Sequence, residues 1–148
     1  MYKHILIPTD GSPQSKKAVA AAIELAKSIG AQVTGLFAAP PATPIVYRNH
    51  LPAGLTTMAE QKAAIEKSAT IYLGIIEQAA KKAGVPCQVM TVTSDYPADT
   101  ILATAKKKKC DLIVMATHGR RGISGVLLGS ETQRVVTHSK IPVMVYPG

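Results

Sequence analysis

The chain has 148 residues, of which 47% are hydrophobic and only 4% aromatic, and 17 Lys and Arg against 9 Asp and Glu give it a net charge of +8. A chain of this length removes roughly 68–70% of its unfolded surface from water in a single core, which excludes intrinsic disorder and makes a structural metal or disulfide unnecessary. The absence of Trp and the single Phe argue against stacking platforms for single-stranded nucleic acid. We therefore expect one domain that spans residues 1–148.

No targeting or membrane-spanning segment is apparent. Only four apolar residues follow His4 before Thr9, and no apolar run approaches the roughly 18 residues of a membrane helix. The run Lys106–Lys109 supplies four of the positive charges at the end of a predicted helix, and no DNA-reading motif accompanies it. We expect a cytoplasmic protein with neither a membrane nor a nucleic acid as partner.

Five apolar segments have the length and composition of β-strands. Runs such as Ile5–Ile7 and Leu112–Ala116 are apolar at consecutive positions, as in parallel strands that are covered on both faces. The five predicted strands are Lys3–Thr9, Gln32–Ala38, Cys87–Thr93, Asp111–Thr117 and Pro142–Tyr146.

Four helical patterns lie between these strands. Their starts are marked by Ser12 before Pro13, by the capping box Thr57-Met58-Ala59-Glu60, by Pro97, and by a second capping box, Ser130-Glu131-Thr132-Gln133. Gly30 and Gly84 end the first two, and Lys106–Lys109 forms the last turn of the third. Strands that alternate with helices predict an α/β fold, a doubly wound five-stranded parallel sheet with helices on both faces.

Polar residues and glycines follow two of the predicted strands where each one ends. The first strand ends in Pro8-Thr9-Asp10-Gly11 and the fourth in Ala116-Thr117-His118-Gly119. Because ligands of open α/β sheets bind outside the carboxyl ends of the strands, neighbouring first and fourth strands would place both segments at one crevice.

A glycine-rich segment, residues 119–130, leads from the fourth strand into the fourth helix. Glycines let backbone amides approach an anion, and a helix N-terminus favours phosphate. The segment lacks the Gly-Lys-Ser/Thr of a P-loop, and no G-x-G-x-x-G follows the first strand. The pattern therefore indicates a phosphate-binding loop that is neither of the kinase type nor of the NAD type.

Together these segments resemble the universal stress protein family over essentially the whole chain. The resemblance rests on Pro8–Ser12, on Met115–Gly119 and on the pair Gly129-Ser130, with nine residues between Gly119 and Gly129. The nucleotide-binding branch of that family carries Gly-x-x-Gly, nine residues, and then Gly-Ser or Gly-Thr; here Ala116 replaces the first glycine. The resemblance implies an ATP-binding domain with sheet order 3-2-1-4-5, usually a homodimer joined through its edge strand, here Val143–Tyr146.

The same resemblance implies a set of ligand-binding residues for ATP, ADP or AMP. Asp10 and its neighbours would contact the adenosine and the backbone near Ala38 the adenine, while Glu131, an anion at a phosphate site, is a questionable member. The implied set is Pro8, Thr9, Asp10, Ala38, Met115, Ala116, His118, Gly119, Arg120, Gly129, Ser130, Glu131 and Thr132.

Several functions remain compatible with these residues. The leading interpretation is a dimeric, ATP-binding stress-response module that acts on a protein partner which the sequence does not identify. The alternatives are a slow ATPase with Mg²⁺ or Mn²⁺ held through the phosphates, and a regulatory protein that binds no nucleotide. His118 has no acid partner or nucleophile apparent in the sequence, so we assign no catalytic residue and no metal ligand; Arg120 fits a phosphate contact and a solvated loop equally well.

Overall fold

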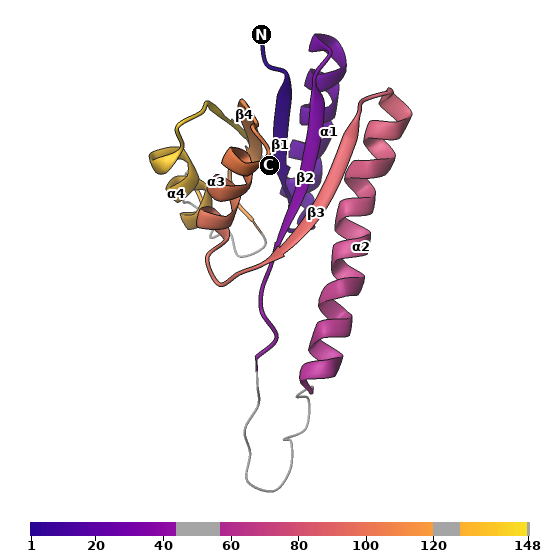
Figure 1. The fold of residues 1–148 in the computed structure, drawn as a ribbon, viewed down its shortest axis with the longest axis vertical. Coiled ribbons are helices and arrows are strands. Elements are labelled where there is room, and N and C mark those ends of the chain that lie inside the picture. Colours follow the sequence, from indigo (N-terminus) through magenta and orange to yellow (C-terminus); the bar gives the residue numbers. More distant parts are fainter. Residues whose placement is uncertain (44–56, 120–127, 148) are drawn as a thin grey trace, which may run out of the picture.

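A computed structural model describes residues 1–43, 57–119 and 128–147 of the chain (Figure 1). Strands and helices alternate along it, as the sequence predicts. The elements are β1 (His4–Pro8), α1 (Pro13–Ile29), β2 (Gln32–Ala39), α2 (Met58–Ala83), β3 (Cys87–Thr93), α3 (Pro97–Lys107), β4 (Leu112–Ala116), α4 (Ser130–His138) and β5 (Val143–Tyr146).

The strands form one parallel sheet in the order β3-β2-β1-β4-β5, which confirms the expected fold class and strand order. β1 lies at the centre, in register with β2 from His4 opposite Gln32 to Pro8 opposite Leu36. Helices α1 and α2 cover one face of the sheet, and α3 and α4 cover the other (Figure 1). The carboxyl ends of β1 and β4 therefore meet at one edge of the sheet.

Two apolar clusters, one on each face of the sheet, form the core. Ile5 and Ile7 of β1 belong to the cluster under α1 and α2, whereas Leu6 between them belongs to the cluster under α3 and α4. All three side chains are 0% exposed. Because successive side chains of a strand point to opposite faces, a central strand covered on both sides must be apolar throughout.

Cys87 begins β3, Cys110 lies in the connection between α3 and β4, and the two do not form a disulfide. Cys87 is half-buried and Cys110 is buried, and both thiols are free. β2 and β1 separate β3 from β4, so the segments that carry the two thiols lie apart in the sheet. Burial raises the pKa of the Cys110 thiol to about 11, so this thiol stays protonated at neutral pH.

Helices α1 and α2 begin and end where the sequence predicts. Ser12 and Thr57 accept hydrogen bonds from the third residue after them, Ser15 N at 3.1 Å and Glu60 N at 3.1 Å. Gly30 and Gly84 then end the two helices in the left-handed conformation, with φ of 71° and 72°.

The prediction of a second capping box, at Ser130–Gln133, was wrong. Helix α4 has Gly129, not Ser130, as its N-cap, and Ser130 is the first helical residue. A side chain at that position does not reach back to the amides of its own first turn in the way that an N-cap side chain does. The predicted last turn of α3 also differs, because the helix ends at Lys107, and Lys109 adopts a left-handed φ of 56°. Within the described ranges, no helix is both long and apolar enough to span a membrane.

Candidate functional site

The loop after β1 is held by a network of short-range hydrogen bonds. Asp10 Oδ1 accepts a hydrogen bond from Ser12 N at 2.9 Å, and Gly11 between them has a φ of 75°. This turn directs the chain from β1 into α1 at once. The Asp10 side chain is thereby held at the carboxyl edge of the sheet, the edge at which the family resemblance implies an adenosine contact.

Thr9 stabilises this loop through hydrogen bonds of its hydroxyl and its backbone. Its Oγ1 accepts hydrogen bonds from Ser15 Oγ at 2.9 Å and from Gly11 N at 3.2 Å, and its backbone N–H donates to Leu36 O at 2.9 Å. Thr9 and Ser15 are 8% and 4% exposed. The family resemblance implies that Thr9 contacts the ligand. In the structure its hydroxyl is engaged in hydrogen bonds that stabilise the loop after β1.

The loops after β1 and β4 come into contact. A carboxylate oxygen of Asp10 lies where a β-carbon on Gly119 would stand. A side chain at position 119 would displace the carboxylate at the tip of the Asp10 side chain. The sequence expectation that the two strand ends share one crevice is in agreement with this contact.

His118 lies beside this contact and has an unsatisfied nitrogen. Its Nδ1 is 3.3 Å from Thr117 Oγ1, whereas its Nε2 is buried and has no hydrogen-bond partner among the described residues. A buried polar atom without a partner is costly, and native sites with one commonly use it for a ligand or a water. The imidazole is therefore available to hydrogen-bond a molecule bound at this edge.

The amino terminus of α4 lies next to His118. Gly129 N donates to Thr117 O at 2.7 Å, and α4 has no side-chain cap of its own. Gly129 has a φ of −64° and a ψ of 157°, a conformation open to any residue. A β-carbon there would meet Thr117 O and the His118 Cα no closer than 3.4 Å, which is ordinary contact. The described fold thus accommodates a side chain at a position where the sequence has none.

Two predicted phosphate-site residues turn away from that terminus. Glu131 Oε2 accepts a hydrogen bond from Ala98 N at the start of α3, at 2.9 Å. Thr132 is 3% exposed, and its hydroxyl donates to Ala116 O at 2.9 Å. Both side chains hold α4 against neighbouring elements, whereas the exposed Ser130 has no such contact in the described chain.

The backbone of Ala38 faces the same edge. In β2 the carbonyl of Leu36 accepts from Thr9 N, toward β1, and that of Ala39 accepts from Ser94 N, toward β3. Because these directions alternate along a strand, the N–H and C=O of Ala38 point toward β1, at a level where β1 has ended. They are suitably placed for the edge of a planar, hydrogen-bonding ring.

Of the remaining predicted residues, three are buried and one lies outside the residues that the structure describes. Pro8, Met115 and Ala116 are buried at the ends of β1 and β4. Ala116 does not have a positive φ, so alanine in place of the motif's first glycine introduces no backbone strain. Arg120 lies outside the described residues.

Sequence reasoning overlooked Ser15 and Tyr72. The ring of Tyr72, on α2, lies against Gly11 and meets Phe37 edge to face, with centroids 5.3 Å apart. Tyr72 is partly buried against the core cluster under α1 and α2, so in the sequence it is one of several apolar positions of the helix. The N-cap spacing predicts a bond to the backbone amide at position 15 and not the bond from the Ser15 hydroxyl to Thr9 Oγ1, which depends on tertiary structure.

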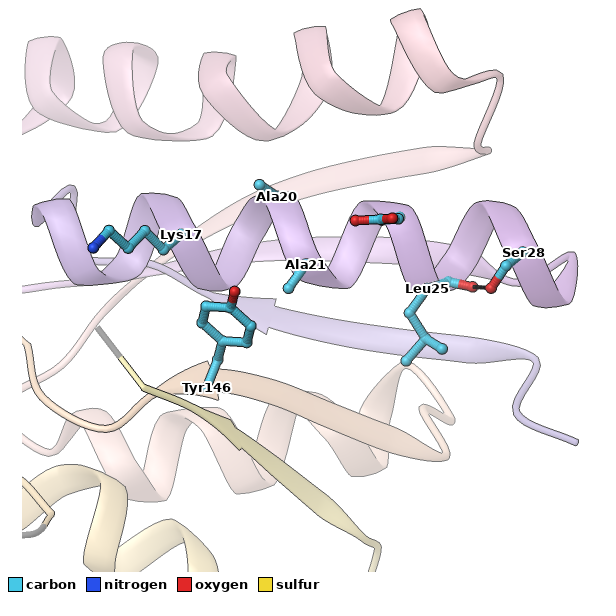
Figure 2. A pocket seen from close by; sticks show the side chains of 7 residues that line it. Lys17, Ala20, Ala21, Leu25, Ser28 and Tyr146 are labelled. Atoms are coloured by element: carbon cyan, nitrogen blue, oxygen red, sulfur yellow. Dashed lines mark hydrogen bonds between the residues drawn. The ribbon is translucent and has the colours of Figure 1, made fainter.

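A separate cavity of about 500 Å³ lies between α1 and the end of β5 (Figure 2). Tyr146 points from β5 toward the α1 face that carries Ala21 and Leu25 (Figure 2). A second cavity, of about 330 Å³, lies beside α3 and β3. Neither is lined by a predicted site residue, and we place the site from the chemistry of the strand ends instead. Among the described residues, His, Cys, Asp and Glu side chains form no group of three or more that could hold a metal ion.

Known proteins are similar to this chain in both sequence and architecture. The profile of the universal stress protein family matches residues 1–147. Universal stress protein MJ0531 of Methanocaldococcus jannaschii is 35% identical over 146 residues, which cover 98% of this chain and 82% of that protein. The structure of UspA from Lactobacillus plantarum superposes with a TM-score of 0.77 at 26% identity, covering 98% of this chain and 97% of that one. A universal stress protein in complex with cAMP superposes with a TM-score of 0.70 at 26% identity, covering 99% and 97% of the two chains. The chain described here belongs to the universal stress protein family.

Proposed function

We propose that the chain is a regulatory module that binds an adenine nucleotide, ATP or its products ADP and AMP, between the loops after β1 and β4. The observation that carries the proposal is Gly129. Its backbone is ordinary and a β-carbon would fit against the described protein, so neither conformation nor packing requires glycine there. Close approach of a phosphate to the start of α4 does require it.

Three further features support the same ligand. The uncapped amino terminus of α4 offers amides and the positive end of a helix dipole to a phosphate. His118 Nε2 offers a buried hydrogen-bonding atom next to it. A relative 26% identical over nearly its whole length binds cAMP, which is also an adenine nucleotide.

These features assign different roles to the residues. Asp10 would accept hydrogen bonds from the ribose hydroxyls, the backbone of Ala38 would contact the adenine, and Gly129 with Ser130 would hold the phosphates. Mg²⁺ or Mn²⁺, where present, would be bound mainly through the phosphates, because Glu131 is already engaged with Ala98 N.

Thermal unfolding with added nucleotides tests the proposal. A ligand at about 100 times its dissociation constant stabilises the folded chain by about 2.7 kcal/mol, so ATP should raise the melting temperature in a concentration-dependent way. GTP serves as the control for adenine specificity. Phosphate release in the same samples would favour the slow-ATPase alternative, and an unchanged melting temperature at millimolar ATP, ADP and AMP would overturn nucleotide binding.

We also propose that the protein is a homodimer joined through β5. This strand ends the sheet, and Met144 and Tyr146 on it are 42% and 36% exposed. The carbonyls of Pro142 and Tyr146 accept from β4, so by alternation the N–H of Val145 points outward, free of the β4 ladder.

A proline at the outward position tests the dimer. Val145→Pro removes an outward N–H without removing a bond to β4, and light scattering at micromolar concentration should then show a monomer where the wild type shows a dimer. Thr91→Pro, which alters an outward position on the opposite edge strand β3, is the matched control and should leave the dimer intact. A monomeric wild type would refute the assembly while leaving nucleotide binding to its own test.

A further inference from the structure

Helix α3 lacks a cap of its own. Its N-cap residue Tyr96 makes no side-chain capping bond, and Pro97 in the first turn has no N–H to offer. The amide of Ala98 is therefore the first N–H of the helix, and Ala98 is 1% exposed. A buried amide at a helix N-terminus needs an acceptor, and no residue of the preceding loop supplies one by its side chain.

The acceptor comes from the neighbouring helix. Glu131, in the first turn of α4, places Oε2 2.9 Å from Ala98 N. A carboxylate in the first turn of a helix ordinarily stabilises its own helix dipole. Here the bond directs it to the amino terminus of α3, which lies beside α4 on the same face of the sheet (Figure 1).

This arrangement leaves the two helix termini in different states. The terminus of α3 is occupied by the carboxylate, whereas that of α4, at the start of which Gly129 lies, has no side-chain cap. The same bond anchors the first turn of α4 to α3. A second tie between the helices, Arg134 to Asp99 at 3.5 Å, is exposed on both sides and contributes little to their placement.

We propose that Glu131 is a positioning residue for the nucleotide site: by capping α3 it fixes the first turn of α4 and keeps its own charge away from the terminus that receives the phosphate. The inference rests on the proposed function. It also accounts for an anion next to a phosphate site, which the sequence alone left unexplained.

Two substitutions separate the hydrogen bond from the charge. Glu131→Gln keeps an oxygen that can accept from Ala98 N, whereas Glu131→Ala removes it. The readouts are the ATP dissociation constant by calorimetry and the hydrogen exchange rate of the Ala98 amide by NMR. In Glu131→Ala we expect faster exchange at Ala98 and ATP affinity lower by about tenfold, the equivalent of one charge-assisted hydrogen bond. Glu131→Gln should retain slow exchange and bind ATP about as tightly as the wild type, because it keeps an acceptor for Ala98 N and so keeps the first turn of α4 in place.

Arg134→Gln is the matched control, since it breaks the exposed contact between the same two helices and should change neither readout. Wild-type ATP affinity in Glu131→Ala would overturn the positioning role. Equal loss of affinity in Glu131→Gln and Glu131→Ala would overturn it too, because it would mean that the carboxylate itself contacts the ligand or its metal. If the wild type binds no adenine nucleotide, the proposed function fails, and unchanged Ala98 exchange in Glu131→Ala would separately refute the capping role.

Discussion

The Asp10 carboxylate occupies the space next to Gly119 that a side chain at position 119 would need. This contact lies between the loops after β1 and β4. Gly119 does not have the left-handed φ of Gly11, so its lack of a side chain matters for space and not for backbone conformation.

Gly119→Ala is therefore expected to displace Asp10 and to disturb its bond to Ser12 N. Because the displaced group is the tip of a flexible side chain, the free energy of unfolding should fall only by about 1 kcal/mol, the net worth of one hydrogen bond, and the displaced carboxylate should also weaken ATP binding. Urea unfolding and calorimetry measure the two effects. A variant with wild-type stability and wild-type affinity would show that the two loops do not depend on this contact.

Gly129→Val is expected to separate binding from folding. The backbone at position 129 is extended and a β-carbon there meets only ordinary contacts, so the melting temperature without ligand should stay close to that of the wild type. ATP binding should be lost, because the side chain would stand where the phosphate approaches α4. Retained affinity would place the phosphates elsewhere on the molecule.

The sequence predicted the fold nearly completely because local signals and the global topology agree. β3 has the predicted bounds, and each of the other four strands differs in length from its predicted range by one or two residues. Consecutive apolar residues such as Ile5–Ile7 indicated central strands, and Thr57 caps α2 through the Glu60 amide, as the Thr57–Glu60 pattern predicts. The four residues Ser130–Gln133 follow the same pattern but do not form a box.

The difference between the two boxes shows what the sequence could not predict. Glu131 and Thr132 bond to Ala98 N and Ala116 O, which are 33 and 16 residues away along the chain. Such contacts exist only once the sheet has brought α3, β4 and α4 together, and no local spacing encodes them. The motif therefore identified the right segment, whereas the direction of each side chain depended on tertiary structure.

Lys109→Gly is expected to stabilise the protein. Lys109 follows α3 with a φ of 56°, whereas α1 and α2 end in glycines with φ of 71° and 72°. A non-glycine residue in this conformation costs roughly 1–2 kcal/mol, and glycine would remove that cost. The greater entropy of glycine in the unfolded chain opposes this gain by roughly 0.5–1 kcal/mol. The net gain of about 0.5–1 kcal/mol is measurable as a higher urea midpoint.

The control for that substitution lies two residues earlier. Lys107 is the last residue of α3, so Lys107→Gly removes the same charge and places glycine in a helical conformation. It should lower the free energy of unfolding by up to about 1 kcal/mol. Equal effects of the two substitutions would mean that charge, not backbone conformation, determines the result.

Acid should destabilise the protein through His4. Its Nε2 lies 2.7 Å from Thr34 Oγ1, and burial lowers the pKa of His4 below 6.5, against the opposing effects of the Lys108 carbonyl and Asp111. The unfolded chain thus takes up the proton at a higher pH than the folded chain, so this contribution to stability is present above about pH 6.5 and is lost as the pH falls from there through the lowered pKa. Asp111 does not titrate in this window, because, although burial opposes its ionisation, bonds from the His4 and Lys3 amides lower its pKa below 3.8. His4→Gln should flatten the pH dependence of the urea midpoint just below pH 6.5. A slope that survives His4→Gln would assign the acid sensitivity to another group.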